Sequence, residues 1–361
     1  MLTISDLTFR IAGRTLFDGA SATVQARSKV GFVGRNGTGK TTLFKLIQGE
    51  LSPESGSIRL PNSTRIGAVA QEAPASDDSL IEWVLAADTE RARLLAEAET
   101  ATDPNRIADI HIRLSDIDAH SAESRGARIL SGLGFSTAAQ ARPCHEFSGG
   151  WRMRVALAGI LFSAPDLLLL DEPTNYLDLE GTLWLETYLA RYPHTVILIS
   201  HDRDLLNGAV TQIMHLDQTK LTTYSGGYDS FARQRAEQAV LQGKRIAKQE
   251  AERKDLQAFV DRFRAKASKA RQAQSRMKRL EKMEQIAPVV DDTVLPIRLQ
   301  EPPGKLSPPI VAMDHVSVGY EPGKPILSRL DLRIDDDDRI ALLGSNGNGK
   351  STFAKLLAGR L

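Results

Sequence analysis

The stretch that decides the fold is KVGFVGRNGTGKTTLFKL, residues 29–46. Its apolar run at residues 30–33 is typical of a buried strand, and a glycine-rich turn and the beginning of a helix follow it. Glycines allow the backbone to curl tightly, so that its N–H groups can approach an anion, and the N-terminus of a helix adds partial positive charge. A glycine-rich turn between a strand and a helix therefore predicts a phosphate-binding loop.

Residues 34–41 of this stretch match the pattern G-x-x-x-x-G-K-[ST] in full. Lys40 can reach the β- and γ-phosphates of a nucleotide, and the Thr41 hydroxyl can ligate Mg²⁺. The alternative is a chance match, but a second full match at residues 344–351 makes chance a poor explanation. The residues that we expect to bind nucleotide in the two loops are Gly34, Arg35, Asn36, Gly37, Thr38, Gly39, Lys40, Thr41 and Thr42, and Gly344, Ser345, Asn346, Gly347, Asn348, Gly349, Lys350, Ser351 and Thr352.

Three apolar runs further along the chain, at residues 66–70, 167–170 and 195–199, are expected to be strands near this loop. The four consecutive leucines of the second run favour a strand that is buried on both faces, as in a parallel sheet. The polar residues that follow the three runs are, in order, Gln71, Asp171 with Glu172, and His201. Because ligand contacts gather at strand ends in open α/β sheets, we expect these side chains to meet at the phosphate loop.

Each of these polar residues has an expected role at a nucleotide. Two carboxylates are costly to bury without a cation, so Asp171 is expected to hold Mg²⁺. Glu172 is placed to orient or deprotonate the attacking water, and His201 to contact the γ-phosphate. The alternatives are a surface glutamine, a carboxylate pair that caps the following turn, and a structural histidine. The expected catalytic residues are Glu172, His201 and Gln71, and the expected metal ligands are Thr41, Asp171, Gln71 and Ser351.

A further glycine-rich segment reads Ser148-Gly149-Gly150 and precedes an apolar segment that ends at Phe162. Two glycines before a helix offer exposed N–H groups at its positive end, which suits a phosphate. The alternative is that Ser148 only caps the helix. The region at residues 79–134 is expected to be a helical insert of about four helices.

The composition excludes several classes of protein. Hydrophobic residues make up 42% and charged residues 25% of the 361 residues, as in ordinary globular proteins. The single cysteine, Cys144, excludes a disulfide framework, a four-cysteine iron–sulfur cluster and a thiolate zinc site. No apolar run approaches the roughly 18 residues that a membrane span needs, and the N-terminus lacks a signal-peptide pattern. We therefore expect a cytoplasmic protein.

Residues 228–286 contain no proline and are expected to form long helices. Residues 231–285 contain 16 Lys and Arg against 7 Asp and Glu, a net charge of +9, while the whole chain carries +1. Two helices packed through their apolar stripes would form an antiparallel hairpin with a small, basic tip that suits a phosphate backbone. The alternative is a solvated hairpin that serves only as a spacer.

Six prolines between residues 288 and 309 mark an extended connector, and residues 311–361 then repeat the pattern of residues 2–51. The repeat contains no counterpart of Gln71, of Ser148-Gly149-Gly150, of Asp171-Glu172 or of His201. The expected domains are a first nucleotide domain at residues 1–227, with a helical subdomain at about 79–164, a basic hairpin linker at 228–290, and the start of a second nucleotide domain at 291–361.

The order of these motifs resembles the ATP-binding-cassette ATPase superfamily. Three details narrow the resemblance to the ABC-F family: SGGWRMR at residues 148–154, DEPTNYLD at 171–178, and FVDRFRAKASKARQAQSRMKR at 259–279. The resemblance covers nearly the whole chain. It implies an α/β fold, with a P-loop cassette made of a mixed sheet core, an antiparallel β part and a helical subdomain, then a helical-hairpin linker and a partial second cassette.

What the resemblance implies about function is specific. ABC-F proteins are soluble tandem cassettes that use Mg²⁺ with ATP and act on ribosomes, where the hairpin reaches the tRNA region and ATP closes the cassettes. The residues that would contact tRNA or rRNA are Arg262, Arg264, Lys266, Lys269, Arg271 and Arg276. The chain departs from the family pattern at Tyr176, where histidine is usual, and at Ile11, which stands in the place of Tyr320 in the repeat.

In the superfamily, each ATP lies between one cassette's phosphate loop and the other cassette's Ser-Gly-Gly. Neither such site is complete within these residues, so we expect a partial sequence of a longer protein that binds MgATP but turns it over slowly by itself. Two other functions stay open: the ATPase subunit of a membrane importer, and a nucleic-acid maintenance ATPase. The basic hairpin argues against the importer, as does Trp151 in place of the glutamine usual in importers.

Overall fold

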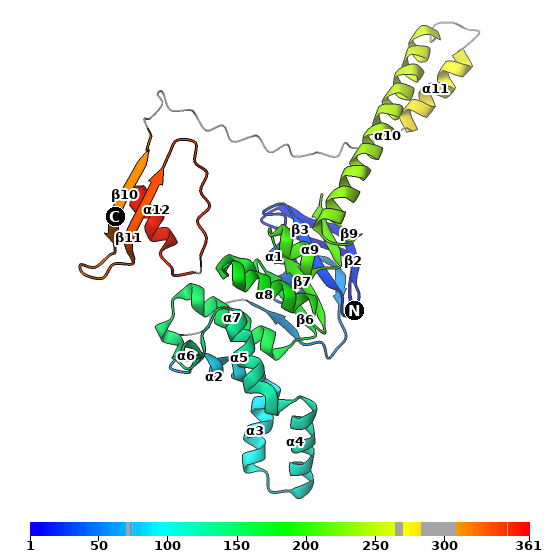
Figure 1. Ribbon diagram of the computed structural model, residues 1–361. Coiled ribbons are helices and arrows are strands. Elements are labelled where there is room, and N and C mark those ends of the chain that lie inside the picture. The colour runs from blue at the N-terminus through cyan, green and yellow to red at the C-terminus, as the bar shows by residue number, and fades with distance from the viewer. Residues whose placement is uncertain (70–72, 74, 264–269, 283–307, 345) are drawn as a thin grey trace. The chain divides into compact units, whose positions relative to one another are not determined.

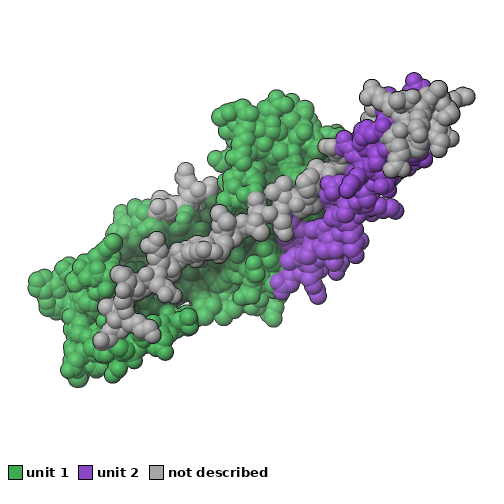
Figure 2. All heavy atoms as spheres, turned by 90° about the horizontal axis from the view of Figure 1, so that it is seen from above, with its two compact units in different colours: residues 1–228, 304–361 green, residues 229–303 purple. Residues whose placement is uncertain are grey.

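The computed structural model describes residues 1–361 with the exception of residues 70–72, 74, 264–269, 283–307 and 345. The chain divides into two compact units, residues 1–228 with 304–361 and residues 229–303 (Figure 2). The first unit contains both phosphate loops, and the second contains the basic helices.

A six-stranded sheet forms the centre of the first unit (Figure 1). Its strands lie in the order β5 (Ile66–Ala68), β6 (Leu167–Asp171), β7 (Thr195–Ile199), β3 (Lys29–Gly34), β8 (Gln212–Asp217) and β9 (Lys220–Ser225). The first five strands are parallel, and β9 runs antiparallel to β8. The apolar runs of β3, β6 and β7 are buried almost throughout, as expected for a parallel sheet. The predicted α/β class is confirmed.

A smaller antiparallel sheet packs beside the first. It consists of β2 (Arg14–Val24), β1 (Leu2–Ile11) and β4 (Ser55–Arg59) in that order. Helix α1 (Lys40–Gln48) follows β3 and buries Leu43, Phe44, Leu46 and Ile47. These residues belong to one apolar cluster with the inward side chains of both sheets, such as Phe17 and Phe32. The cluster holds the phosphate loop between the two sheets.

Helices fill the segment between β5 and β6. Their bounds are α2 (Leu80–Ala86), α3 (Thr89–Thr100), α4 (Pro104–Asp116), α5 (Ala122–Gly132), α6 (Thr137–Gln140) and α7 (Gly149–Ser163), with short 3₁₀ turns at η1 (Ala119–Ser121) and η2 (Cys144–Glu146). Ser79 and Glu82 form a reciprocal capping box at the start of α2, and Pro104 opens α4. The prediction of about four helices at residues 79–134 is confirmed by α2 to α5.

Helices α3 and α4 form a hairpin that extends away from the rest of the subdomain (Figure 1). Its own small core contains Leu94, Ile110 and Leu114. Two ion pairs add to this contact, Arg106 with Glu97 and Arg113 with Glu90, each at 2.6 Å. Such exposed pairs contribute little, so the apolar contact is the main source of the hairpin's stability.

The remaining helices complete the two units. Their bounds are α8 (Leu179–Ala190), α9 (Arg203–Ala209), α10 (Tyr228–Phe263) and α11 (Ala270–Lys282). In the second unit, α10 and α11 lie side by side (Figure 1), and Leu256 and Val260 of α10 are buried. The Arg276 guanidinium of α11 lies 3.6 Å from the ring centroid of Phe259 on α10. Packing through an apolar stripe is thus seen on α10, whereas in the stripe expected on α11 Met277 is 38% exposed and Arg276 makes the contact with Phe259.

The C-terminal repeat contains β10 (Val311–Val318), β11 (Leu327–Ile334) and α12 (Lys350–Leu357). Strands β10 and β11 pair antiparallel, as β1 and β2 do. Both pairs contain the same irregularity, with Asp6 at φ +48° in β1 and His315 at φ +49° in β10. This agreement in backbone detail supports an internal duplication.

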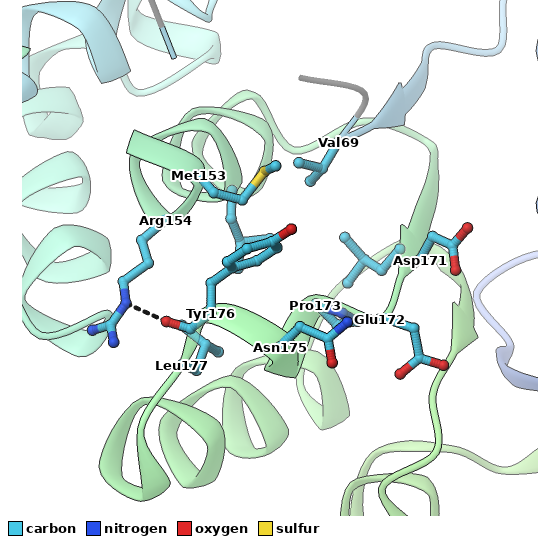
Figure 3. A pocket seen from close by; sticks show the side chains of 11 residues that line it. Val69, Met153, Arg154, Asp171, Glu172, Pro173, Asn175, Tyr176 and Leu177 are labelled. Carbon is cyan, nitrogen blue, oxygen red and sulfur yellow. Dashed lines mark hydrogen bonds between the residues drawn. The ribbon is translucent and has the colours of Figure 1, made fainter. Parts of the chain in front are cut away.

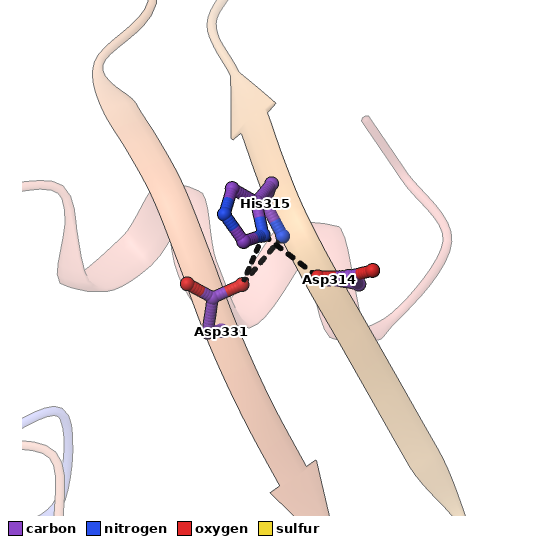
Figure 4. A group of neighbouring side chains, drawn as sticks. All are labelled: Asp314, His315 and Asp331. Carbon is purple, nitrogen blue, oxygen red and sulfur yellow. Dashed lines mark hydrogen bonds and ion pairs between the residues drawn. The ribbon is translucent and has the colours of Figure 1, made fainter.

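The irregularity in β10 places Asp314, His315 and Asp331 close together (Figure 4). The His315 N–H donates to Asp331 Oδ1 at 2.6 Å. The Asp6 N–H of β1 donates in the same way to Ser21 Oγ at 2.9 Å. Different side chains thus make the same bond in both copies. The group of Asp314, His315 and Asp331 is therefore explained by a structural role: it fixes the bulged backbone of β10, and we call it the clamp of this strand.

Because the repeat copies the pattern of residues 2–51, its apolar run at residues 340–343 is expected to be a strand like β3. This prediction is wrong for the residues that the structure describes, which show no strand there. In the first copy, β3 lies between β7 and β8, whereas the repeat offers no such neighbours in its described part. The side chains of Ile340, Leu342, Leu343 and Leu357 are 41–78% exposed. A partial cassette is expected to expose Leu342, Leu343, Leu356 and Leu357, which a complete one would cover. This is confirmed for Leu342, Leu343 and Leu357, while Leu356 is half-buried.

A buried arginine joins α7 to the turn η3 (Pro173–Tyr176), which follows β6. Arg154 is 1% exposed and donates from Nε to the Tyr176 carbonyl at 2.6 Å and from Nη1 to the Leu133 carbonyl at 3.0 Å. Its Nη2 lies 3.6 Å from Asp178 Oδ2, and its guanidinium stacks on Trp151. Burial raises the pKa of Asp178, but backbone N–H bonds and Arg154 outweigh it, so this pKa lies below its usual value.

Replacing Arg154 by alanine should destabilise the first unit. The change removes the donor of the Tyr176 and Leu133 carbonyls and the cation beside the Asp178 carboxylate. Breaking a buried ion pair from one side costs about 3 kcal/mol. Urea unfolding followed by circular dichroism should show this loss for Arg154→Ala. The control Arg128→Ala removes an exposed arginine of the neighbouring α5. A loss below about 1 kcal/mol, equal to that of the control, would contradict the assignment.

Candidate functional site

The phosphate loop has the conformation that its glycines predict. Gly37 and Gly39 have φ values of +73° and +110°, in the region that side chains rarely adopt. A Cβ atom on Gly39 would also lie 3.3 Å from the Leu16 side chain. The loop therefore stays close to β2, and Gly39 ends it as the residue before α1.

Lys40 folds back over the loop. Its Nζ donates to the carbonyls of Gly34 at 2.8 Å and Arg35 at 3.1 Å. Burial lowers the pKa of Lys40, while the nearby Glu172 and Asp171 carboxylates raise it in part. A bound phosphate would add negative charge and favour the protonated amine. In the repeat, Lys350 Nζ donates to the Gly344 carbonyl at 2.6 Å, so the two loops share this arrangement.

The fold brings together Thr41 and Asp171, which are 130 residues apart in the sequence. The Thr41 hydroxyl, at the start of α1, donates to Asp171 Oδ2, at the end of β6, at 2.7 Å. A hydroxyl and a carboxylate are hard oxygen ligands of the kind that Mg²⁺ prefers. The donor set therefore fits this ion. Gln71, the other expected ligand of the first copy, lies outside the described residues, and Ser351 holds the place of Thr41 in α12.

Glu172 and His201 meet beside this pair. Glu172 follows β6 at φ +49°, and the His201 N–H donates to Glu172 Oε2 at 3.2 Å. His201 Nε2 lies 3.1 Å from Asn36 Oδ1 of the loop and 3.5 Å from Glu172 Oε1. Glu172 Oε1 is buried and makes no hydrogen bond among the described residues. An acceptor in this position is available to a water molecule.

These side chains line one cavity of about 380 Å³. Lys40, Asp171, Glu172 and His201 are separated by up to 161 residues in the sequence, and they all contribute to its wall. They converge because β3, β6 and β7 are adjacent and parallel, so that their carboxyl ends share one edge. The combination of the Lys40 amine, hard oxygen ligands and a Glu172 oxygen without a hydrogen bond suits a magnesium-bound triphosphate.

A second, smaller cavity lies behind Glu172, between α7, β6 and η3 (Figure 3). Its volume is about 120 Å³. Arg154 and Tyr176 contribute to its wall on the side of η3, and their hydrogen bond holds the turn that carries Glu172. Sequence reasoning gave Arg154 no role of its own. The sequence does contain a sign of this role, because Arg154 directly precedes the apolar run VALAGILF. An arginine that is buried together with such a run needs hydrogen-bond acceptors or a carboxylate.

The Ser148-Gly149-Gly150 segment lies at the N-terminus of α7 and does not line the Lys40 cavity. Ser148 occupies the N-cap position, but its side chain makes no capping hydrogen bond. Ser148 thus stands at the cap position that the alternative gave it, but without the side-chain hydrogen bond of a serine cap. Ser148 and Gly150 are exposed, so the hydroxyl and the first N–H groups of the helix are accessible.

The second phosphate loop contacts the segment that follows Glu172. The Asn346 side-chain amide donates to the Tyr176 carbonyl at 3.3 Å, and its backbone N–H donates to Asp178 Oδ2 at 3.4 Å. Ser345 lies outside the described residues. Thr352 is buried in α12, and Tyr320 is 55% exposed and accepts a hydrogen bond from Lys355.

The hairpin residues expected to contact RNA are only partly described. Arg264, Lys266 and Lys269 lie outside the described residues. Arg262 and Arg271 lie in the facing ends of α10 and α11. Arg276 stacks on Phe259, so its guanidinium stabilises the hairpin itself.

Known proteins resemble this chain in sequence and in fold. Two family models, both described as ABC transporter, match residues 17–175 and 214–297. Within the described residues, no helix is long and apolar enough to span a bilayer. Among solved structures, the ATP-binding subunit of an ABC transporter is 18% identical, with a TM-score of 0.48, over 65% of this chain and 93% of that chain.

Curated relatives match almost the whole chain. "Probable ATP-binding protein YheS" of Haemophilus influenzae is 46% identical over 367 residues, which is 100% of this chain and 57% of the relative. Human "ATP-binding cassette sub-family F member 3" is 40% identical over 359 residues, 96% of this chain and 50% of the relative. The chain thus spans about half the length of these relatives. With the motifs and the fold, these matches show that the chain belongs to the ABC-F family of ATP-binding-cassette proteins.

Proposed function

We propose that this chain binds MgATP in the Lys40 cavity and hydrolyses it in a protein that acts on the ribosome. The observation that carries the first part is the convergence of Lys40, Thr41, Asp171, Glu172 and His201 on one cavity. The second part is supported by the family and by the net charge of +9 at residues 231–285, which suits a phosphate backbone.

The loop residues would bind the β- and γ-phosphates through Lys40 and the N–H groups before α1. Thr41 and Asp171 would hold Mg²⁺, which when bound neutralises phosphate charge. Glu172 accepts a proton from water while the water oxygen bonds to the γ-phosphorus and the bond to the bridging oxygen breaks, giving ADP and phosphate. His201, held by Asn36 at 3.1 Å, orients the γ-phosphate and the water.

We assign residues 1–227 to the first cassette, 228–290 to the linker hairpin and 291–361 to the start of the second cassette. The contact of Asn346 with Tyr176 and Asp178 supports a second loop that faces the first cassette. Accessible N–H groups at Ser148-Gly149-Gly150 would then complete a site with Lys350. ATP binding between cassettes would close them and move the hairpin against tRNA or rRNA.

The Lys40→Ala substitution should weaken ATP binding by this chain about 30-fold or more, because it removes a charge-assisted bond to phosphate. Isothermal titration with MgATP measures the change. Lys45→Ala is the matched control, since Lys45 is exposed on the same helix and does not line the cavity. Equal affinities for both variants and the unmodified chain would show that the loop is not the ATP site.

Glu172→Gln should keep ATP binding and lower phosphate release at least about 100-fold, because the amide cannot take the proton from water. Release of labelled phosphate from the whole protein measures this, with Glu180→Gln, an exposed position of α8, as the control. In the same whole protein, Glu172→Gln should co-sediment with ribosomes only when ATP is present. Equal co-sedimentation of this variant with ribosomes in the presence and absence of ATP would contradict the proposed cycle.

Turnover by this chain alone should depend on association. Because the repeat at residues 311–361 supplies no Ser-Gly-Gly to the Lys40 site, the specific ATPase rate should rise with protein concentration, as two copies pair their first cassettes. Dilution from about 10 μM to about 0.1 μM should lower the rate per chain at least about tenfold if the pair is weak, with a Kd above about 3 μM. A rate per chain that stays constant and rapid over this range would show that hydrolysis does not need two cassettes at one ATP site.

A further inference from the structure

A cavity of about 730 Å³ lies at the edge of the six-stranded sheet that is opposite to the phosphate loop. Residues next to the starts of three strands contribute to its wall: Arg65 before β5, Ala164 before β6 and His194 before β7. Because these strands are parallel, their amino ends share one edge, whereas the Lys40 cavity lies at their carboxyl ends. This cavity is therefore separate from the proposed ATP site.

Helix α8 supplies an aromatic wall to the cavity. Trp184 and Tyr188 are one helical turn apart, their ring centroids are 5.1 Å apart, and both side chains are half-buried. The Tyr188 hydroxyl donates to the Leu161 carbonyl at 3.0 Å, which fixes this ring against the end of α7. An aromatic surface that is held in this way suits a planar ring that packs against it.

Helix α5 adds two guanidinium groups, Arg125 and Arg128, which are three residues apart and both line the cavity. Arg125 lies over the Phe162 ring at 5.5 Å and donates from Nη1 to Asp118 Oδ2 at 3.4 Å, while its Nε and Nη2 make no hydrogen bond in the described part of the chain. Arg128 is exposed and has no hydrogen bond or ion pair among the described residues. Burial raises the pKa of Tyr188, and the charges of both arginines lower it in part, so they lie near the aromatic wall. Two neighbouring cations on one helix repel each other, and a bound anion would relieve this repulsion.

Carboxylates line the side of the cavity that belongs to the hairpin of α3 and α4. Asp88 caps α3, Glu90 pairs with Arg113 at 2.6 Å, and Asp116 is exposed at the end of α4. Ionised carboxylates only accept hydrogen bonds, so this side suits hydroxyl or amino donors and not a second anionic group. The cavity thus combines a cationic side, an aromatic wall and an acceptor side.

We propose that this cavity binds a mononucleotide, with the phosphate on the two arginines of α5, the base against the aromatic wall of α8, and the ribose hydroxyls toward the carboxylates of the hairpin. Arginine binds phosphate through paired N–H donors, and bases pack on aromatic side chains. The volume of about 730 Å³ falls in the range of small-molecule sites, about 300–1,000 Å³. A nucleotide bound here leaves the Lys40 cavity free for MgATP.

Isothermal titration of this chain with AMP tests the site, because AMP lacks the β- and γ-phosphates that Lys40 is expected to bind. We expect a Kd below about 1 mM. Replacing Arg125 and Arg128 together by alanine should weaken AMP binding at least about tenfold, because the charge-assisted bonds to phosphate are lost. Arg191→Ala is the matched control, since Arg191 is exposed directly after α8 and does not line the cavity. Lys40→Ala should also leave the AMP affinity unchanged.

Two fragments of AMP show which contacts hold it. Ribose 5-phosphate lacks the base and adenosine lacks the phosphate, so each should bind at least about tenfold more weakly than AMP. The proposal is overturned if AMP does not bind below about 1 mM, if it binds no more tightly than ribose 5-phosphate, or if the double substitution leaves its affinity unchanged. An equal loss of AMP affinity in Lys40→Ala would also overturn it, because AMP would then occupy the phosphate loop.

Unfolding in urea checks that the double variant is folded. Arg128→Lys gives a second, milder test, because lysine keeps the positive charge but lacks the paired donors of arginine. This variant should bind AMP at least about threefold more weakly than the unmodified chain does. An unchanged affinity in Arg128→Lys would contradict the assigned contact between Arg128 and the phosphate.

Discussion

The hydrogen bond between the Thr41 hydroxyl and the Asp171 carboxylate is the contact on which the rest of the site depends. It joins the start of α1 to the end of β6 at 2.7 Å and closes one side of the cavity. Asp171 can reach Thr41 only because β3, β7 and β6 are adjacent and parallel. The same strand order brings Glu172 and His201 to that edge. The burial of the apolar strands thus fixes the positions of Asp171, Glu172 and His201 at the edge of the sheet.

Much of this arrangement could be predicted from the sequence, because its signals are local. The loop at residues 34–41 has its own pattern, and the runs that end at Asp171 and His201 are short, apolar and followed by polar residues. Parallel strands then require that these ends meet. The contribution of Arg154 could not be predicted, because its acceptors at Leu133, Tyr176 and Asp178 lie 21 to 24 residues away and come together only in the tertiary fold.

The repeat shows the limit of local signals most clearly. Residues 340–343 have the composition of β3 but are not a strand in the described structure, since a strand needs neighbours to pair with. The hairpin of β10 and β11 forms because its pairing is local, and it keeps the bulge of the first copy with different side chains. The duplication kept the bulge of the first copy because the His315 N–H and the Asp331 carboxylate still form the bond that holds it.

The central claim is that one magnesium-bound triphosphate lies among Lys40, Thr41, Asp171, Glu172 and His201. A crystal structure of this chain with Mn²⁺ and a non-hydrolysable ATP analogue tests it directly, because Mn²⁺ can be located by anomalous scattering. The account predicts the ion beside Thr41 Oγ1 and Asp171 Oδ2, with the γ-phosphate next to Lys40 and His201. An ion or a triphosphate bound away from these side chains would contradict the account.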